Sequence, residues 1–247
     1  MNPVIELLQS HRSVRKYKPG EVADELVESI VRSAQMASTS SNVQAYSVIA
    51  VTNPETKRAI SAIAGNQQHV ESCPVLLIWC ADLRRSRLAC EKHDVQMVSG
   101  TMENFVVAAV DVALAAQNAA IAAESLGLGI VYIGGIRNDL RAITPLLHIP
   151  ELVFPVFGMC LGYPDQETSL RPRLPLRAVL HRETYEDDEK KSESVEEYDR
   201  TTREYYIERT NGKRDTTWSR EMADKFKRPV RAYLRDYLEE QGFRFDT

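Results

Sequence analysis

The stretch QNAAIAAESLGLGIVYIGGIRN, residues 117–138, combines the signals of a helix, a strand and a glycine turn. Its alanine-rich first part continues an apolar run and predicts a long helix over residues 101–126, in which small side chains permit close helix packing. Gly127 predicts the end of that helix, and GIVYI predicts a strand over residues 129–133. The strand ends at Gly134-Gly135, which fits either a plain turn or a place where a flat ligand approaches the backbone.

The most apolar part of the chain, residues 105–128, also contains Asp111, Gln117, Asn118 and Glu124. A membrane span needs ~20 predominantly apolar residues with few charges. We therefore expect a buried core helix and no membrane partner. Glu6 and Gln9 interrupt the apolar residues near the N-terminus, so no signal peptide is indicated and the cytoplasm is the expected location.

The remaining patterns predict further helices and strands. Helices are expected over residues 3–11 and 24–38, from Pro54 onward, and from a cap at Asn138 to about Pro145. Strands are expected at β-branched or continuously apolar runs, residues 47–52, 75–80 and 153–161. Pro155 interrupts the last run and predicts that this strand lies partly at a sheet edge.

The amino-acid composition of the sequence changes after Gly162-Tyr163-Pro164. Residues 165–180 are rich in proline and arginine, residues 186–204 are highly charged, and residues 218–241 show the apolar spacing of one amphipathic helix. We expect residues 1–164 to form an α+β core and residues 165–247 to form an arm of the same single domain. Aromatic side chains on such an arm need a surface to pack on, which indicates a partner subunit.

The composition excludes several classes of function. The net charge of −4 and a pI of about 5.8 leave no global basic field for nucleic acid. Four cysteines without a CxxC pair, and five histidines without ligand spacing, predict no metal site and buried free thiols in a reducing compartment. P-loop, GxGxxG, GxSxG and HExxH motifs are also missing.

Two segments of the sequence contain clusters of side chains that can bind anions. His11-Arg12-Ser13-Val14-Arg15 brings two guanidiniums, an imidazole and a hydroxyl together, and an extended backbone would point Ser13 and Arg15 to the same side. Alternation would also align the two arginines of Arg171-Pro172-Arg173. A guanidinium group can bind two phosphate oxygens at once, although each cluster taken alone is more often solvated surface charge. The residues alone indicate a phosphate-bearing ligand at most.

The order of these pieces resembles the nitroreductase superfamily, in its NADPH-dependent, FMN-binding branch of oxygen-insensitive nitroreductases and flavin reductases. The motifs that carry the resemblance span nearly the whole chain: HRSVRKY, SSNVQ, GNQQHV, QNAAIAAESLGLGIVYIGGIRN, FGMCLGYP, RPRLP and EYYIERTNGKRDTTWS. It implies a nitroreductase-like α+β fold with a central, mainly antiparallel sheet surrounded by helices, a long buried core helix, and an intertwined homodimer with two FMN sites.

Carried over by position, the resemblance also implies which residues hold FMN. His11, Arg12, Ser13 and Arg15 would hold the ribityl and phosphate groups, with Arg171 and Arg173 completing the phosphate site. Gln67 would bond the edge of the isoalloxazine ring. Tyr132, Ile133, Gly134 and Gly135 would lie against the flavin through their backbone, and the partner subunit would supply Thr39, Ser40, Ser41 and Gln44.

The late segment RTNGKR resembles the loop that takes the 2′-phosphate of NADPH, with Arg209, Lys213 and Arg214 as the candidate residues. The implied reaction is a ping-pong transfer from NADPH to a small acceptor such as a nitroaromatic, a quinone or free flavin. Flavin N5 carries the hydride, so no catalytic side chain is expected. Arg15 is the candidate cation for the N1–O2 edge of the ring.

Two other functions remain compatible with these residues. The chain could carry reduced FMN to a monooxygenase as a donor partner, or it could share the fold and perform another reductive task such as dehalogenation. The basic RTNGKR segment favours a reductase that binds NADPH itself.

Overall fold

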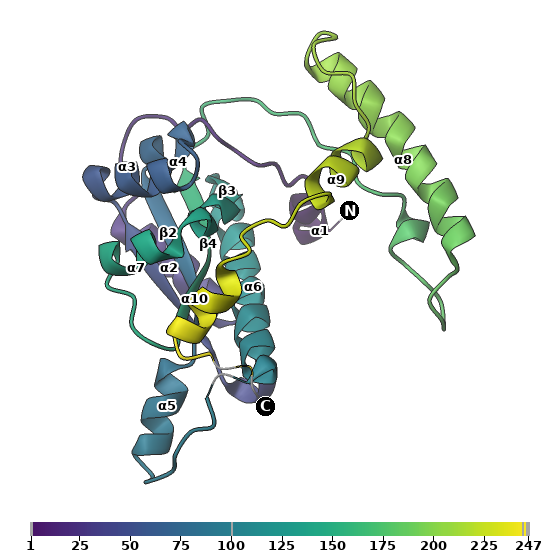
Figure 1. Cartoon of the computed structure of the whole chain (residues 1–247). Coiled ribbons are helices and arrows are strands. Elements are labelled where there is room, and N and C mark those ends of the chain that lie inside the picture. Colours follow the sequence, from purple (N-terminus) through teal and green to yellow (C-terminus); the bar gives the residue numbers. More distant parts are fainter. Residues whose placement is uncertain (1, 100, 244, 246–247) are drawn as a thin grey trace. The chain divides into compact units, whose positions relative to one another are not determined.

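The computed structural model describes residues 2–99, 101–243 and 245 of the chain. The described residues divide into two compact units, one of residues 1–168 with 231–247 and the other of residues 169–230. Figure 1 labels the helices and strands of both units.

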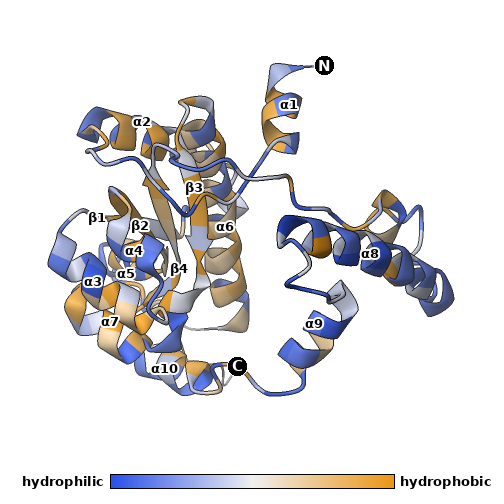
Figure 2. Ribbon diagram, turned by 90° about the horizontal axis from the view of Figure 1, so that it is seen from above, coloured by the Kyte–Doolittle hydropathy of each residue, from blue (hydrophilic) through white to orange (hydrophobic). Residues whose placement is uncertain are grey.

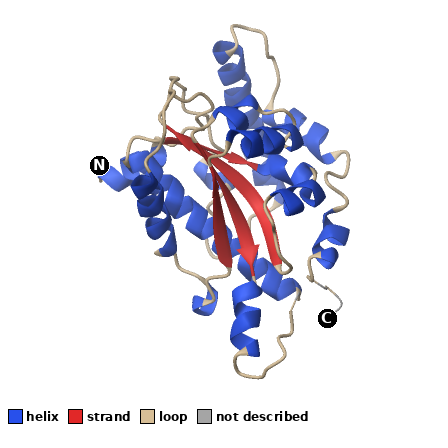
Figure 3. Ribbon diagram, turned by 90° about the vertical axis from the view of Figure 1, so that its left-hand side faces the viewer, coloured by secondary structure: helices blue, strands red, loops and turns tan. Residues whose placement is uncertain are grey.

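The first unit is built on one antiparallel sheet of four strands in the order β1-β2-β4-β3 (Figure 3). The strands are β1 (Tyr46–Val51), β2 (Val75–Asp82), β3 (Gly129–Ile133) and β4 (Val153–Gly162). Every residue of β2 is buried, as its continuous apolar sequence predicts for a strand covered on both faces. The predicted α+β class with a central antiparallel sheet is confirmed.

Pro155 occupies a position where β4 has one neighbouring strand. β3 pairs with β4 only between Gly158 and Gly162, so the first half of β4 pairs with β2 alone. The register between β2 and β4 shifts between Trp79 and Cys80, directly opposite this part of β4. The predicted partial edge is therefore confirmed, because a proline that cannot donate a ladder hydrogen bond is tolerated beside a bulge and an open edge.

The long helix α6 (Met102–Ser125) runs along one side of the sheet and contacts all four strands. The helices α3 (Pro54–Ile63) and α7 (Leu140–Leu146) lie on the other side (Figure 2). Alanine provides most of its buried face, and α2 (Asp24–Gln35) packs on it. By length and composition alone, α6 could also cross a membrane, as core helices of soluble proteins often could. Its buried face includes Asp111, in agreement with the predicted core helix.

Short helices complete the first unit. They are α1 (Pro3–Gln9), η1 (Ser40–Asn42), α3 (Pro54–Ile63), α4 (Gln68–Ser72), α5 (Arg84–Glu91), η2 (Gly134–Asn138), α7 (Leu140–Leu146) and α10 (Leu234–Glu240). The sequence patterns missed α4 and α5, which are short and carry little apolar periodicity. The predicted cap of α7 was wrong by one residue, because Asp139 accepts from the Ala142 amide while Asn138 donates to the Ile63 carbonyl.

The second unit consists of η3 (Leu176–Ala178), α8 (Asp188–Arg209) and α9 (Trp218–Phe226). α8 is hydrophilic over most of its length (Figure 2) and buries a narrow stripe of Ser194, Tyr198, Thr202 and Tyr206. The single helix predicted over residues 218–241 was wrong. It is divided into α9 and α10, because Pro229 cannot continue a helix and Arg231 adopts a left-handed φ of 57°.

Candidate active site

The end of β3 lies against the turn between α3 and α4. A Cβ added to Gly135 would come within 2.6 Å of both the Ala64 carbonyl oxygen and Nε2 of Gln67. The Gln67 amide itself donates to that carbonyl at 2.7 Å. Only glycine allows this approach, so the structure brings together two of the predicted positions, Gln67 and Gly135. The adjacent Gly134 has more space, and Ile133 is buried at the end of the strand.

The N-terminal basic segment lies beside the same strand. Ser13 forms a parallel bridge with Ile130, and the Val14 amide donates to the Ile130 carbonyl at 2.9 Å. The Val14 side chain packs against Gly129, where a Cβ would come within 2.6 Å of it. The segment is extended as predicted, and Arg12 and Arg15 flank the bridge as exposed side chains. From Ile130 to Ile133 the strand advances about 10 Å, so the basic segment and the glycine turn share one edge of the sheet.

His11 is fixed by a residue that the motifs did not identify. Its Nδ1 lies 2.6 Å from Oε1 of Glu124, in the last turn of α6, and both side chains are partly buried. With Nδ1 engaged, Nε2 is the nitrogen left for a ligand. Glu124 entered the sequence analysis only as a charge that argues against a membrane span. Nothing local could connect it with a histidine 113 residues away.

His69 is a second residue that the sequence analysis missed, although it stands two positions after Gln67. Its Nε2 is buried without a hydrogen-bond partner in the described part of the chain. Burial lowers the pKa of His69, and the positive charge of Arg15 lowers it further. The backbone amide of Arg15 donates to the Gln166 side chain. Within the described residues, no hydrogen bond or ion pair engages the Arg15 guanidinium. Nε2 of His69 and the Arg15 guanidinium thus both lack a hydrogen-bond partner among the described residues.

The serine loop of residues 39–45 lies elsewhere in the first unit. Asp111, in the middle of α6, accepts hydrogen bonds from the amides of Ser40 and Ala45. Glu124, which holds His11, is 13 residues further along the same helix, a distance of about 20 Å at the rise of an α-helix. One subunit therefore does not bring Thr39, Ser40, Ser41 and Gln44 to the His11 segment.

The predicted cations of the second unit are mostly engaged with their neighbours. Arg171 donates to the Tyr206 hydroxyl at 2.6 Å, and Arg173 folds back to the Arg171 carbonyl at 2.8 Å. Arg209 bonds the Tyr205 hydroxyl at 3.0 Å. Arg214 pairs with Glu221 and lies over the ring of Tyr206. Lys213 is exposed, and its ammonium contacts no partner within residues 169–230.

The comparison with known proteins supplies the family. Residues 8–163 match the model of the nitroreductase family, and residues 171–246 match the model of that family's C-terminal domain. The chain belongs to the nitroreductase family. The resemblance predicted from the motifs is confirmed, and the two models together span both compact units of this nitroreductase family member.

Full-length relatives agree with this assignment. A Bacillus subtilis protein named FMN reductase (NADPH) is 47% identical, over 98% of this chain and 99% of the relative. The oxygen-insensitive NADPH nitroreductase of Salmonella typhimurium is 39% identical, over 98% of this chain and 99% of the relative. The solved structure of B. megaterium NfrA1 superposes with a TM-score of 0.96 at 45% identity and covers both chains completely.

Among residues 2–99, 101–243 and 245, no group of three or more histidine, cysteine, aspartate or glutamate side chains is arranged to hold a metal ion.

Proposed function

We propose that this protein is an FMN-dependent oxidoreductase that takes hydride from NADPH and reduces nitroaromatics, quinones or free flavin by a ping-pong mechanism. The observation that carries the proposal is the pairing of Ser13 with Ile130, which joins the basic segment to the strand that ends at Gly134-Gly135. Relatives named FMN reductase and NADPH nitroreductase, aligned over nearly the whole chain, support the choice of cofactor and donor.

The residues of the first unit fit FMN in shape and charge. The close approach at Gly135 holds the Gln67 amide against the turn at the end of β3, where this amide is proposed to bond the edge of the ring. His11, Ser13 and the arginines at positions 12 and 15 are candidates for the ribityl and phosphate groups, for which Arg171 and Arg173 remain predicted ligands. When bound, FMN supplies hydride chemistry at N5.

The protein's own side chains would orient the cofactor and adjust its electrostatics. Glu124 holds the His11 ring so that Nε2 can face a ligand. Arg15 brings a fixed positive charge that lies close enough to His69 to lower the pKa of that imidazole. We propose that the same charge stabilises electron density at the N1–O2 edge of the flavin. No side chain has to act as a nucleophile.

We also propose a homodimer, in which the arm of residues 165–247 wraps around the partner subunit through residues 169–230, because residues 231–247 pack with the core of their own subunit. One face of α6 is apolar and exposed, at Met102, Val106, Val110 and Leu114, which recur every four residues and retain 45–54% exposure. Such a stripe on a core helix favours a second copy as its cover. The distance of the serine loop from His11 supports a site that uses both subunits. A reductase of this kind would act in the cytoplasm.

Lys213 is expected to set the preference for NADPH over NADH. Its exposed ammonium is unpaired within the second unit, whereas Arg214 is already neutralised by Glu221. Lys213→Ala should raise the KM for NADPH by roughly fivefold, since a charge-assisted hydrogen bond to phosphate is lost, and leave the KM for NADH unchanged. Steady-state kinetics with both donors measure this. Lys225→Ala removes a matched lysine from α9 as the control, and an equal loss with both donors would contradict the assignment.

The function itself is tested by the visible spectrum of the purified protein, recorded before and after NADPH is added without air. A flavin spectrum that bleaches at once supports an NADPH-dependent FMN reductase. A flavin spectrum that NADPH leaves unchanged rules out NADPH as the donor. Protein that stays colourless even after added FMN refutes the proposal.

A further inference from the structure

The loop between α2 and β1 has an unusual backbone for residues that carry a Cβ. Ser41, Asn42 and Gln44 have φ values of 47°, 58° and 54°, all in the left-handed region. Residues with a Cβ disfavour this region, so the conformation persists only when surrounding groups hold it. Two side chains from other elements hold both ends of this loop.

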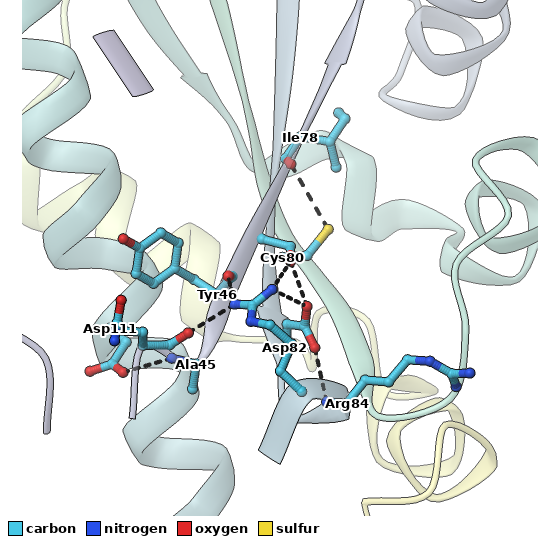
Figure 4. A network of polar contacts seen from close by, with 10 residues as sticks. Ala45, Tyr46, Ile78, Cys80, Asp82, Arg84 and Asp111 are labelled. Carbon is cyan, nitrogen blue, oxygen red and sulfur yellow. Dashed lines mark hydrogen bonds and ion pairs between the residues drawn. The ribbon is translucent and has the colours of Figure 1, made fainter. Parts of the chain in front are cut away.

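Asp111 fixes the loop from inside the protein. Its carboxylate is completely buried on α6, with Oδ1 3.0 Å from the Ser40 amide and Oδ2 3.0 Å from the Ala45 amide. Figure 4 shows this carboxylate beside Ala45. Each oxygen accepts from one end of the loop, so a single side chain sets the span between them. Only a carboxylate has two equivalent acceptors in this geometry.

Arg85 fixes the second end from the surface. Its guanidinium donates to the Gln44 carbonyl at 2.9 Å and to the Tyr46 carbonyl, and it also reaches the Ser47 hydroxyl at 2.8 Å. Asp82, at the buried end of β2, holds the same guanidinium at 3.1 Å. Figure 4 shows Tyr46 and Asp82 on the two sides of this contact. The loop is thus clamped between a core helix and the start of α5.

We propose that Asp111 and Arg85 are positioning residues, which hold residues 39–44 of one subunit in the form that completes the FMN site of the other. The inference rests on the proposed function. Neither side chain needs to touch the flavin. A loop that is already ordered loses little conformational entropy when the ligand binds, so removing either clamp should weaken FMN binding without changing the chemistry of bound FMN.

Arg85→Ala tests this at the surface, where more than half of the side chain is exposed. Apoprotein dimer is titrated with FMN by fluorescence quenching, and NADPH turnover is measured at saturating FMN. We expect Arg85→Ala and Asp111→Asn each to raise the Kd for FMN about tenfold, as the loss of a hydrogen bond to a charged group predicts, with turnover at saturating FMN preserved.

Arg84→Ala is the matched control, because it removes the same charge from the neighbouring residue. The Arg84 side chain points away from Ala45 (Figure 4) and forms no hydrogen bond or ion pair with the described residues of the loop. This variant should bind FMN like the wild type. If Asp111→Asn does not fold, the Kd for FMN of Arg85→Ala alone tests the inference. Wild-type protein that binds FMN no better than Arg85→Ala overturns this inference and leaves the proposed function intact. Wild-type protein that binds no FMN overturns the proposed function as well.

Mixed dimers test whether the loop acts across the interface. One subunit carries Gln67→Ala and the other carries Arg85→Ala, and differently tagged copies allow this heterodimer to be purified. If the loop serves the partner's site, both defects fall on the site of the Gln67→Ala subunit, and the other site keeps the wild-type Kd. Two weakened sites would show that the loop serves its own subunit and would overturn the inference.

Discussion

Gly135→Ala is expected to lower both the thermal stability of the protein and its affinity for FMN. The added methyl group would lie 2.6 Å from a backbone oxygen of Ala64 and 2.6 Å from the Gln67 amide, between two groups that bond each other. Neither the end of α3 nor the turn at η2 can move aside easily. Overpacking of this kind costs ~2 kcal/mol, which corresponds to roughly 5 °C in Tm for a chain of this size.

The effect on the cofactor should be larger than the effect on the fold. Gln67 has to leave the position from which it is proposed to bond the ring, so we expect the Kd for FMN to rise more than tenfold. Calorimetry of the apoprotein and FMN titration measure the two effects separately. Gly134→Ala is the control for stability, because its Cβ would meet only the end of the Arg137 side chain, at 3.4 Å. Equal Tm values for the two variants would refute the close-approach argument.

Arg15→Ala is expected to slow the reduction of bound flavin by NADPH about 100-fold, the magnitude typical for the loss of one preorganised charge at a reacting centre. The guanidinium is exposed and engages no partner in the described part of the chain, yet it acts on His69 through its charge. The measurement is anaerobic stopped-flow reduction with FMN at saturation, so that weaker binding does not contribute.

Two variants separate the charge of Arg15 from its position. Arg15→Lys keeps the charge and should restore much of the rate, although a single ammonium lacks the fork of the guanidinium. Lys16→Ala removes a charge from the next residue, which an extended backbone directs to the opposite side, and should reduce flavin at the wild-type rate. If Arg15→Ala reduces saturated flavin as fast as the wild type, its proposed role is wrong.

The local pattern of the sequence identified the main elements of the core. The continuous apolar run of residues 75–80 predicted a strand buried on both faces, and β2 has that burial over its whole length. GIVYI predicted β3 with its observed bounds, and the alanine-rich run predicted α6 within one residue at each end. These elements depend on side-chain periodicity and on glycine stops, which are properties of neighbouring residues.

The same local reasoning failed where two signals competed. The apolar spacing of residues 218–241 predicted one helix, but Pro229 lies inside it and divides it into α9 and α10. The apolar spacing predicted one helix in spite of Pro229, because Phe226 and Val230 continue the apolar pattern on both sides of this proline. In the structure both side chains are exposed, so the pattern there does not mark a buried face within this chain.

The sequence by itself determined the family, the strands and the long helix of this protein, and its motifs named candidate ligands for FMN and NADPH that remain predictions. Only the tertiary structure decided what holds those candidates in place. Glu124 meets His11 across 113 residues, and Asp111 meets Ser40 across 71. Both acids occupy an apolar helix where composition gives them no role. Their partners are set by the path of the chain around the sheet, which local spacing does not encode.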